Sequence, residues 1–327
     1  MSTTALESDR RFLIDIRQNF FEGTLHLSAS TREDVTFDSH GTACAAWLYR
    51  PTGATNPPII VMAHGFAAMR ALRLDAYADR FADAGYAVLV FDYRGWGDSA
   101  GEPRRVLDIG AQQQDWRAGV AYARALNGVD ASRVVLWGTS FGGGHALHLA
   151  AEDHDVAAVI AQVPHISGPA SAFSQPPGLV VRLIAAGVRD QARALVGRPP
   201  YRVPAAGYPG EVAMMTSPDA APMAIRLAGD RYEELLPEND VAARIALRVP
   251  FYSPGRQAPK ITAPTLVQIA ERDTVTPFDV ALKAAQRIPK GEIRTYDCQH
   301  FEPYLDPYFD TVVADQLTFL ATHVPPA

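Results

Sequence analysis

Short runs of consecutive apolar residues recur along this chain. They alternate with stretches in which apolar residues return every three or four positions. The runs at 59–62 (IIVM) and 134–137 (VVLW) are typical of strands buried on both faces of a parallel sheet. The spacing of three to four is typical of helices with one apolar face. We expect strands at 33–37, 44–49, 59–62, 87–91, 133–137, 157–163, 265–269 and 292–296, and helices at 74–84, 109–126, 141–151, 277–287 and 307–323.

Repeated strand–helix units with short connections predict the α/β class, with a mostly parallel, doubly wound sheet. The alternation stops at 166–256, where helical patterns at 179–196 and 240–249 are separated by stretches rich in Pro and Gly. We interpret this region as an inserted helical cap; the alternative is an ordinary helical pair packed on the sheet. The expected organisation is an N-terminal extension (1–30), an α/β core (31–165 and 257–327) and the cap insertion (166–256).

The composition narrows the class of protein. Of the 327 residues, 48% are hydrophobic and 20% are charged, as in packed globular proteins. The formal net charge is −6 and no long Lys/Arg block is present, so we expect no nucleic-acid partner. No apolar run reaches the roughly 20 residues that a membrane span needs. No signal peptide is visible, so we expect no membrane partner and a cytoplasmic location.

The segment Gly138-Thr139-Ser140-Phe141-Gly142 matches the pattern G-x-S-x-G. The pattern follows an expected strand and opens an expected helix. A sharp turn between such elements needs small residues on both sides of the serine, and the two glycines meet that need. The sequence therefore predicts Ser140 as a nucleophile.

A serine nucleophile needs a base, and nine histidines compete for that role. His145 and His148 lie on the expected helix behind Ser140, and His165 ends a strand that precedes the acid candidate. His300 follows the last expected strand, at the end of the sheet where the carboxyl ends of strands gather. We predict His300 as the base.

The base in turn needs a carboxylate to orient its imidazole ring. Asp273 lies in a short polar loop just after the expected strand at 265–269. Its rivals are Glu271, nearer the strand end, and Asp279, in the first turn of the next helix. We predict Asp273, and the resulting chain order Ser–Asp–His is that of the α/β-hydrolases.

Two backbone N–H groups are needed to hold a developing oxyanion. We expect them at Phe141, at the start of the helix after the serine, and at Phe66, after His64-Gly65. His64 is expected to brace this loop. The segment 91–99, dense in turn residues, is interpreted as a structural turn. In the cap, Met214, Met215 and Phe173 are the candidate residues of the substrate pocket.

Together these segments resemble the serine α/β-hydrolase superfamily. More narrowly, the chain is similar to bacterial hydrolases related to dienelactone hydrolase, X-Pro dipeptidyl-peptidase and serine aminopeptidase. The likeness covers roughly 30–325, apart from the middle region. It implies a Ser140–Asp273–His300 triad, no metal and no cofactor. Dienelactone hydrolases carry a cysteine where this chain has Ser140. The segments that carry the likeness are 61–66, 91–95, 137–143, 271–273 and 300–304.

The sequence therefore predicts a serine hydrolase of the carboxylesterase type. It would cleave a small-molecule ester or lactone through an acyl-enzyme. Three alternatives stay open: an aminopeptidase that binds the substrate ammonium with Asp230, Glu233 and Glu234; an acyl-transferring or cyclising enzyme; and a silent binding scaffold. Cys44 and Cys298 fit neither a disulfide framework nor a zinc site. The apolar segment 12–21 leaves a homodimer open.

Overall fold

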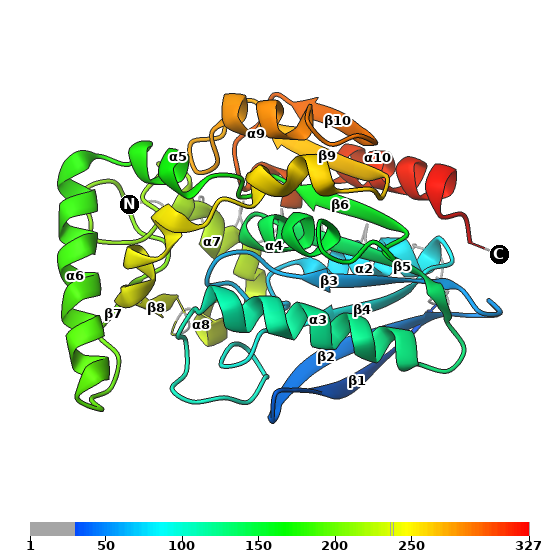
Figure 1. Cartoon of the computed structure of the whole chain (residues 1–327), viewed down its shortest axis with the longest axis horizontal. Helices are drawn as coiled ribbons and strands as arrows, with labels where there is room; N and C mark the ends of the chain where they lie inside the picture. The colour runs from blue at the N-terminus through cyan, green and yellow to red at the C-terminus, as the bar shows by residue number, and fades with distance from the viewer. Residues whose placement is uncertain (1–29, 236, 238, 327) are drawn as a thin grey trace, which may run out of the picture.

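The structure, a computed structural model, describes residues 30–235, 237 and 239–326. An eight-stranded sheet forms its centre, in the order β1-β2-β4-β3-β5-β6-β9-β10 (Figure 1). The first two strands and the β2–β4 pair are antiparallel, and all other neighbours are parallel. The predicted α/β class with a mostly parallel sheet is confirmed. The strands are β1 (Ser30–Ser39), β2 (Thr42–Pro51), β3 (Pro58–Ala63), β4 (Ala87–Phe91), β5 (Asp130–Thr139), β6 (Ala158–Gln162), β9 (Thr265–Ala270) and β10 (Gly291–Tyr296).

The sheet is covered by helices on both faces because its central strands are apolar on both faces. In β3, Ile59 and Val61 pack on one side with the helices α3, α4 and α9. Ile60 and Met62 pack on the other side with α2 and α10. This alternation is the period of two expected for a strand. The helices are α2 (Leu74–Asp83), α3 (Ile109–Ala125), α4 (Phe141–Ala150), α9 (Phe278–Ala285) and α10 (Phe309–His323).

The chain between β6 and β9 contributes no strand to the large sheet. We call residues 168–260 the cap segment; Figure 1 shows most of it beyond one end of the sheet, while its last turn, Pro254–Lys260, packs against α4 and α9. A two-stranded sheet, β7 with β8, lies within it. Its elements are α5 (Gly168–Phe173), α6 (Pro177–Leu195), β7 (Arg202–Pro204), α7 (Ala220–Ala228), η1 (Gly229–Arg231), α8 (Tyr232–Leu235), β8 (Asp240–Ala242), η3 (Ala243–Leu247), η4 (Val249–Phe251) and η5 (Pro254–Lys260).

The helix expected at 240–249 is wrong. Residues Asp240–Ala242 form β8 and Ala243–Leu247 form a 3₁₀ helix. Asp240–Ala242 pair with Arg202–Pro204 of β7, and the backbone N–H groups of Ala242 and Ala243 donate to the Arg105 and Tyr201 oxygens. Tertiary hydrogen bonds thus override the local helical pattern. The expected N-terminal extension and the apolar segment 12–21 lie outside the described residues.

A buried ion pair joins α6 to η3 within the cap segment. The side chain of Asp190 has no exposed surface, and it lies 2.6 Å from the Nε of Arg244. It also accepts the Tyr201 N–H at 2.7 Å and the Arg244 N–H at 2.9 Å. Burial alone would raise the pKa of Asp190, but its bonds from Arg244 and Tyr201 hold that pKa below its usual value.

We expect Asp190→Ala to lower the free energy of unfolding by about 3 kcal/mol, since Arg244 loses its buried partner. The folded-state pKa of Asp190 lies below the unfolded-state value of about 3.9. The stabilisation that the ionised Asp190 gives the folded protein is therefore fully present above the unfolded-state pKa, and it is lost as the pH falls through the folded-state pKa. Urea unfolding of both proteins at neutral pH and at about pH 3 measures this.

The matched control is Asp310→Ala, which breaks the exposed pair between Arg80 and Asp310. Exposed pairs contribute little, so we expect a change within about 0.5 kcal/mol. Equal effects of the two substitutions, or an Asp190 effect that grows in acid, would contradict the role given to the buried pair.

Candidate active site

Ser140 lies in a tight turn between β5 and α4, with φ 52° and ψ −118°. The chain folds back so closely that the residues two positions before and after Ser140 have no room for side chains. A Cβ on Gly138 would lie 2.2 Å from the carbonyl oxygen of Gly142, and a Cβ on Gly142 would lie 2.4 Å from that of His64. Both glycines of the G-x-S-x-G pattern are thus required by space. The turn presents the Ser140 side chain at the carboxyl end of the sheet.

The structure brings the three residues of the expected triad together. The Nε2 of His300 lies 3.0 Å from the Oγ of Ser140, and its Nδ1 lies 2.7 Å from the Oδ2 of Asp273. All three are nearly enclosed, with exposed fractions of 8% for Ser140, 8% for Asp273 and 1% for His300. They follow the ends of β5, β9 and β10, so the sheet brings Ser140 close to two residues that lie more than 100 positions later in the chain.

The contacts of Asp273 indicate which nitrogen of the His300 ring carries the hydrogen. Its Oδ1 accepts the N–H groups of Val275 at 2.8 Å and Thr276 at 2.7 Å, and its Oδ2 accepts the Thr276 hydroxyl at 2.7 Å. Burial would raise the pKa of Asp273, but His300 and the Thr276 hydrogen bonds outweigh burial and lower it. The ionised carboxylate can only accept, so the Nδ1 of neutral His300 carries the hydrogen. Its Nε2 is then free to accept from Ser140.

The two rivals of Asp273 lie elsewhere. Glu271 is exposed, and Asp279 occupies the first turn of α9, where a carboxylate interacts favourably with the helix dipole. Of the rival histidines, His145 is buried and bonds the Tyr252 hydroxyl at 2.8 Å and Gln112 at 3.0 Å. This position fits the expectation that His145 lies on the helix behind Ser140.

The loop after β3 lies directly against Ser140. A Cβ on Gly65 would lie 3.0 Å from the Cβ of Ser140 and 3.3 Å from the carbonyl oxygen of Thr139. Phe66 follows, and its ring meets that of Phe141 edge to face, with 5.6 Å between ring centres. Phe141 is the first residue of α4, so its N–H has no partner within the helix. The expected donors, Phe66 and Phe141, thus lie on the two segments that flank the Ser140 side chain.

A buried charge network supports this loop from behind. Asp92 accepts the Arg70 N–H at 2.7 Å and the Arg70 guanidinium at 2.8 Å. His64 lies beside them, with its Nδ1 3.0 Å from the Gly65 oxygen, and burial lowers the pKa of His64 to about 4. His64 is therefore neutral near pH 7. These contacts fit a bracing role for His64 and a structural role for the turn at 91–99.

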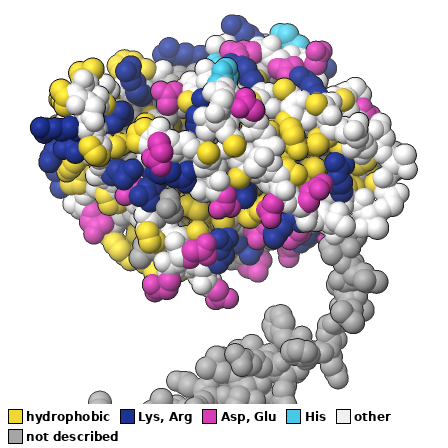
Figure 2. All heavy atoms as spheres, turned by 90° about the horizontal axis from the view of Figure 1, so that it is seen from below, with side chains coloured by type: hydrophobic (Ala, Val, Ile, Leu, Met, Phe, Trp, Pro, Cys, Tyr) yellow, Lys and Arg dark blue, Asp and Glu magenta, His cyan; other side chains and the backbone are white. Residues whose placement is uncertain are grey.

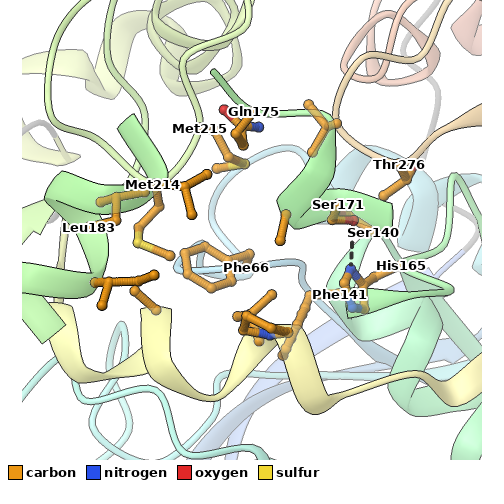
Figure 3. Close-up of a pocket in the computed structure, with 17 residues that line it drawn as sticks. Phe66, Ser140, Phe141, His165, Ser171, Gln175, Leu183, Met214, Met215 and Thr276 are labelled. Carbon is orange, nitrogen blue, oxygen red and sulfur yellow. Dashed lines mark hydrogen bonds between the residues drawn. The ribbon is translucent and has the colours of Figure 1, made fainter. Parts of the chain in front are cut away.

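An apolar cavity opens in front of Ser140, between α6 and the sheet (Figure 3). We call it the α6 cavity; it has a volume of about 820 Å³, part of which is open to solvent. Met214 and Met215 line it, as predicted from the sequence, together with Leu183 from α6. The face of α6 that turns inward was not predicted from the sequence. The apolar lining is typical of a small-molecule site.

The prediction for Phe173 is wrong, since its side chain is 88% exposed and lies outside the cavity lining. The reason is the docking of α5, whose Gly168 N–H donates to the Tyr252 oxygen at 2.8 Å. A Cβ on Gly168 would lie 1.9 Å from the Val249 oxygen, so the helix approaches this backbone very closely. That docking turns Ser171 toward the cavity and Phe173 toward solvent.

A second polar pair, Ser171 and His165, lies in the α6 cavity. Ser171 was not among the residues predicted from the sequence. The Oγ of Ser171 is 3.4 Å from the Nδ1 of His165, as the dashed line in Figure 3 marks. The Nε2–H of His165 donates to the Tyr252 oxygen at 3.2 Å. Burial lowers the pKa of His165 to about 4, so the ring is neutral near pH 7. His165 therefore lines the site without contacting the Ser140 hydroxyl.

Within 30–235 and 239–326, no three His, Cys, Asp or Glu side chains are grouped so that they could hold a metal ion. No helix in those ranges has the length and apolar character needed to cross a bilayer. On the face shown in Figure 2, basic and acidic side chains are interspersed.

Comparisons with known proteins agree with the fold. A family model described as Serine aminopeptidase, S33, matches residues 55–196. The quorum-quenching protein AidA of Acinetobacter baumannii is 45% identical over 297 residues, which are 89% of this chain and 95% of that protein. The thiohydrolase aneE of Aspergillus aculeatus is 27% identical over 82% of this chain and 86% of its own length. The crystal structure of the α/β-hydrolase GrgF from a Penicillium species matches with a TM-score of 0.74, at 24% identity, over 90% of this chain and 99% of that one.

We expect Gly65→Ala to slow the labelling of Ser140 by a fluorophosphonate probe at least about tenfold, because the new methyl group would press on the serine side chain. The control is Gly178→Ala on α6, where a Cβ would meet nothing within 4 Å. Labelling rates followed by gel fluorescence, with circular dichroism to verify folding, measure the effect. Equal labelling of both variants would show that this loop does not shape access to Ser140.

Proposed function

This chain belongs to the α/β-hydrolase superfamily, among the serine aminopeptidase S33-like hydrolases, and from that premise we propose that it hydrolyses carboxylic esters or lactones through an acyl-enzyme on Ser140. The observation that carries the proposal is the chain of contacts Ser140–His300–Asp273 beside an apolar cavity. The 3.0 Å and 2.7 Å distances along this chain of contacts support a proton transfer from Ser140 to His300.

Acylation begins when the Oγ of Ser140 attacks the substrate carbonyl carbon. The Nε2 of His300 takes the hydroxyl proton, and Asp273 stabilises the imidazolium that forms. The negative charge moves to the carbonyl oxygen, and the N–H groups of Phe66 and Phe141 hold it there. His300 then gives its proton to the departing alcohol, and the acyl group stays on Ser140 as an ester.

Deacylation repeats these steps with water. His300 takes a proton from a water molecule as its oxygen attacks the acyl carbon, and the same two N–H groups hold the oxyanion. The bond to the Oγ of Ser140 breaks, and His300 returns the proton to that oxygen. A carboxylic acid leaves and the free serine is restored.

The lining of the α6 cavity supports an apolar acyl group. The name of one relative adds a substrate type to the proposal, and the name of another adds a biological context. The name thiohydrolase of aneE supports including thioesters, which the same nucleophile attacks. Quorum quenching, in the name of AidA, adds a biological context in which a lactone signal is a suitable test substrate.

The aminopeptidase alternative has weaker support, although the family model carries that name. A substrate ammonium would need carboxylates inside the site. Asp230, Glu233 and Glu234 are exposed on η1 and α8, and Glu234 is paired with Arg231 at 2.7 Å. None of the three lines the α6 cavity.

We expect Ser140→Ala to lower the turnover of p-nitrophenyl esters, from acetyl to dodecanoyl, at least about 1,000-fold, because the nucleophile is removed. Release of p-nitrophenol at pH 7.5 measures it. The control is Ser132→Ala, which removes an exposed hydroxyl near the start of β5.

Turnover retained in Ser140→Ala would sink the proposal. Faster product release on adding an alcohol or amine, with transfer product in place of acid, would favour the acyl-transfer alternative. Hydrolysis of aminoacyl anilides that is lost in Glu233→Gln/Glu234→Gln would favour the aminopeptidase. Absence of turnover on esters, thioesters, lactones and anilides, with Ser140 unreactive to the probe, would favour the silent scaffold.

A further inference from the structure

Resting on the proposed function, we infer that Ser140 stands at the junction of two apolar spaces and that the substrate is an acyl compound with two apolar arms. One arm is the acyl chain, which lies in the α6 cavity. The other is the alcohol or thiol leaving group, which lies in a separate channel beside α7. The best substrates are then esters, thioesters or large lactones in which both sides of the carbonyl are apolar.

The second space begins at Ser140 and runs away from α6. Its first part, of about 680 Å³, lies between the loop after β3, helix α7 and η6 (Glu302–Tyr304). A further space of about 910 Å³ continues it. Both parts share the lining residues Ala67, Met69, Leu72, Ala206, Ala224 and Asn239. We call the two parts together the α7 channel.

Small side chains create the room in the α7 channel. Alanines line it from several segments: Ala67 and Ala68 after β3, Ala205 and Ala206 after β7, and Ala224 on α7. A larger residue at any of these positions would project into the channel. The lining is apolar near Ser140 and ends at the exposed side chains of Tyr208 and Glu211. The channel thus leads from the reacting atoms to solvent.

The two spaces meet only at Phe66, Ser140 and Met215, which line both. The Met215 backbone is fixed by two hydrogen bonds, its N–H to the Ala205 oxygen at 2.9 Å and its carbonyl from the Gly207 N–H at 3.0 Å. Met215 lines both spaces, so this residue lies between them at the junction. A flexible substrate reaching Ser140 must place one part on each side of this residue.

The position of His300 assigns the arms. The leaving group receives its proton from the Nε2 of His300, so it departs on the side of that residue. The ring of Phe301 meets that of His300 edge to face, with 4.8 Å between ring centres, and Phe301 and Tyr304 line the α7 channel. Thr276 lines the α6 cavity, and its hydroxyl lies 3.4 Å from the other ring nitrogen, the Nδ1 of His300. After the bond from the acyl carbon to the leaving oxygen breaks, the protonated alcohol has a route to solvent. The acyl chain remains in the α6 cavity, joined to the Oγ of Ser140, until water attacks.

Two plugging variants test the inference. Ala172→Phe adds a ring to the α6 cavity, and Ala224→Phe adds one to the α7 channel. Ala192→Phe, at an exposed position of α6, is the control that adds the same ring outside both spaces. Substrates are one series of methyl esters with acyl chains of two to twelve carbons and one series of acetates with alcohols of one to twelve carbons. Acid release is followed at constant pH.

In the wild type, kcat/KM should rise in both series, by up to about fourfold for each buried methylene. Ala172→Phe should lower the ratio of long to short acyl chains at least tenfold and leave the ratio for the alcohol series as in the control. Ala224→Phe should do the reverse. Single-turnover deacylation of a preformed acyl-enzyme should match the control in Ala224→Phe, because the channel is empty at that stage.

Plugs that act on the same series, on neither, or on the opposite series would overturn the inference. Inactivation by p-nitrophenyl alkylphosphonates separates this failure from failure of the proposed function. If no phosphonate modifies Ser140, the proposed function itself fails. If Ser140 reacts but the plugs do not discriminate methyl from octyl chains, only the two-armed site is wrong.

Discussion

The tight turn at Ser140 places a constraint on every segment that surrounds it. A positive φ at a residue that carries a side chain is strained, and it persists only where the surroundings hold it. Here the absence of side chains at Gly138 and Gly142 leaves room for the turn. The hydrogen bond from the backbone N–H of Ser140 to the carbonyl oxygen of Gln162, at 2.9 Å, holds it. The backbone carbonyl oxygen of Ser140 accepts a hydrogen bond from the backbone N–H of His165 at 2.8 Å. The backbone of the turn is thus tied to the end of β6 and to the segment after it, and the Oγ of Ser140 lies 3.0 Å from the Nε2 of His300.

The same constraint brings the core and the cap segment together. Because Gly142 sits against the His64 oxygen, the loop after β3 must pass directly over the serine, and it divides the space above the sheet. Phe66 on that loop lines both the α6 cavity and the α7 channel. The cap segment closes the outer walls through α6 and α7, and the buried Asp190–Arg244 pair holds α6 to η3. The three residues of the predicted triad therefore follow strands of the sheet, while the cap segment supplies much of the lining of the α6 cavity.

The sequence predicts the parts that local chemistry decides. The strands β3 and β4 are apolar on both faces, so their runs are unambiguous, and the two glycines around Ser140 report a turn that admits no other residue. Asp273 and His300 were predicted to lie near Ser140 because loops after parallel strands meet at one edge of the sheet, and the structure brings the three side chains together. The positions of these residues depend on the topology of the sheet, which the repeated strand–helix units already predict.

The cap segment could not be predicted in this way. Residues 240–249 have a helical spacing, yet bonds to Arg105 and Tyr201 impose a strand and a 3₁₀ helix. Phe173 looked like a pocket residue because it is aromatic, but the docking of α5 turns it to solvent. Ser171 and the alanines of the α7 channel carry no sequence signal, since their importance comes from which way their short elements face.

The most direct test of the account is to locate the nucleophile chemically. The folded protein would be treated with a fluorophosphonate, digested, and the modified peptide sequenced by mass spectrometry. The account predicts one adduct, on Ser140, which disappears when the protein is unfolded before treatment. An adduct on another residue such as Ser171, or none on the folded protein, would contradict the claim that His300 and Asp273 activate Ser140.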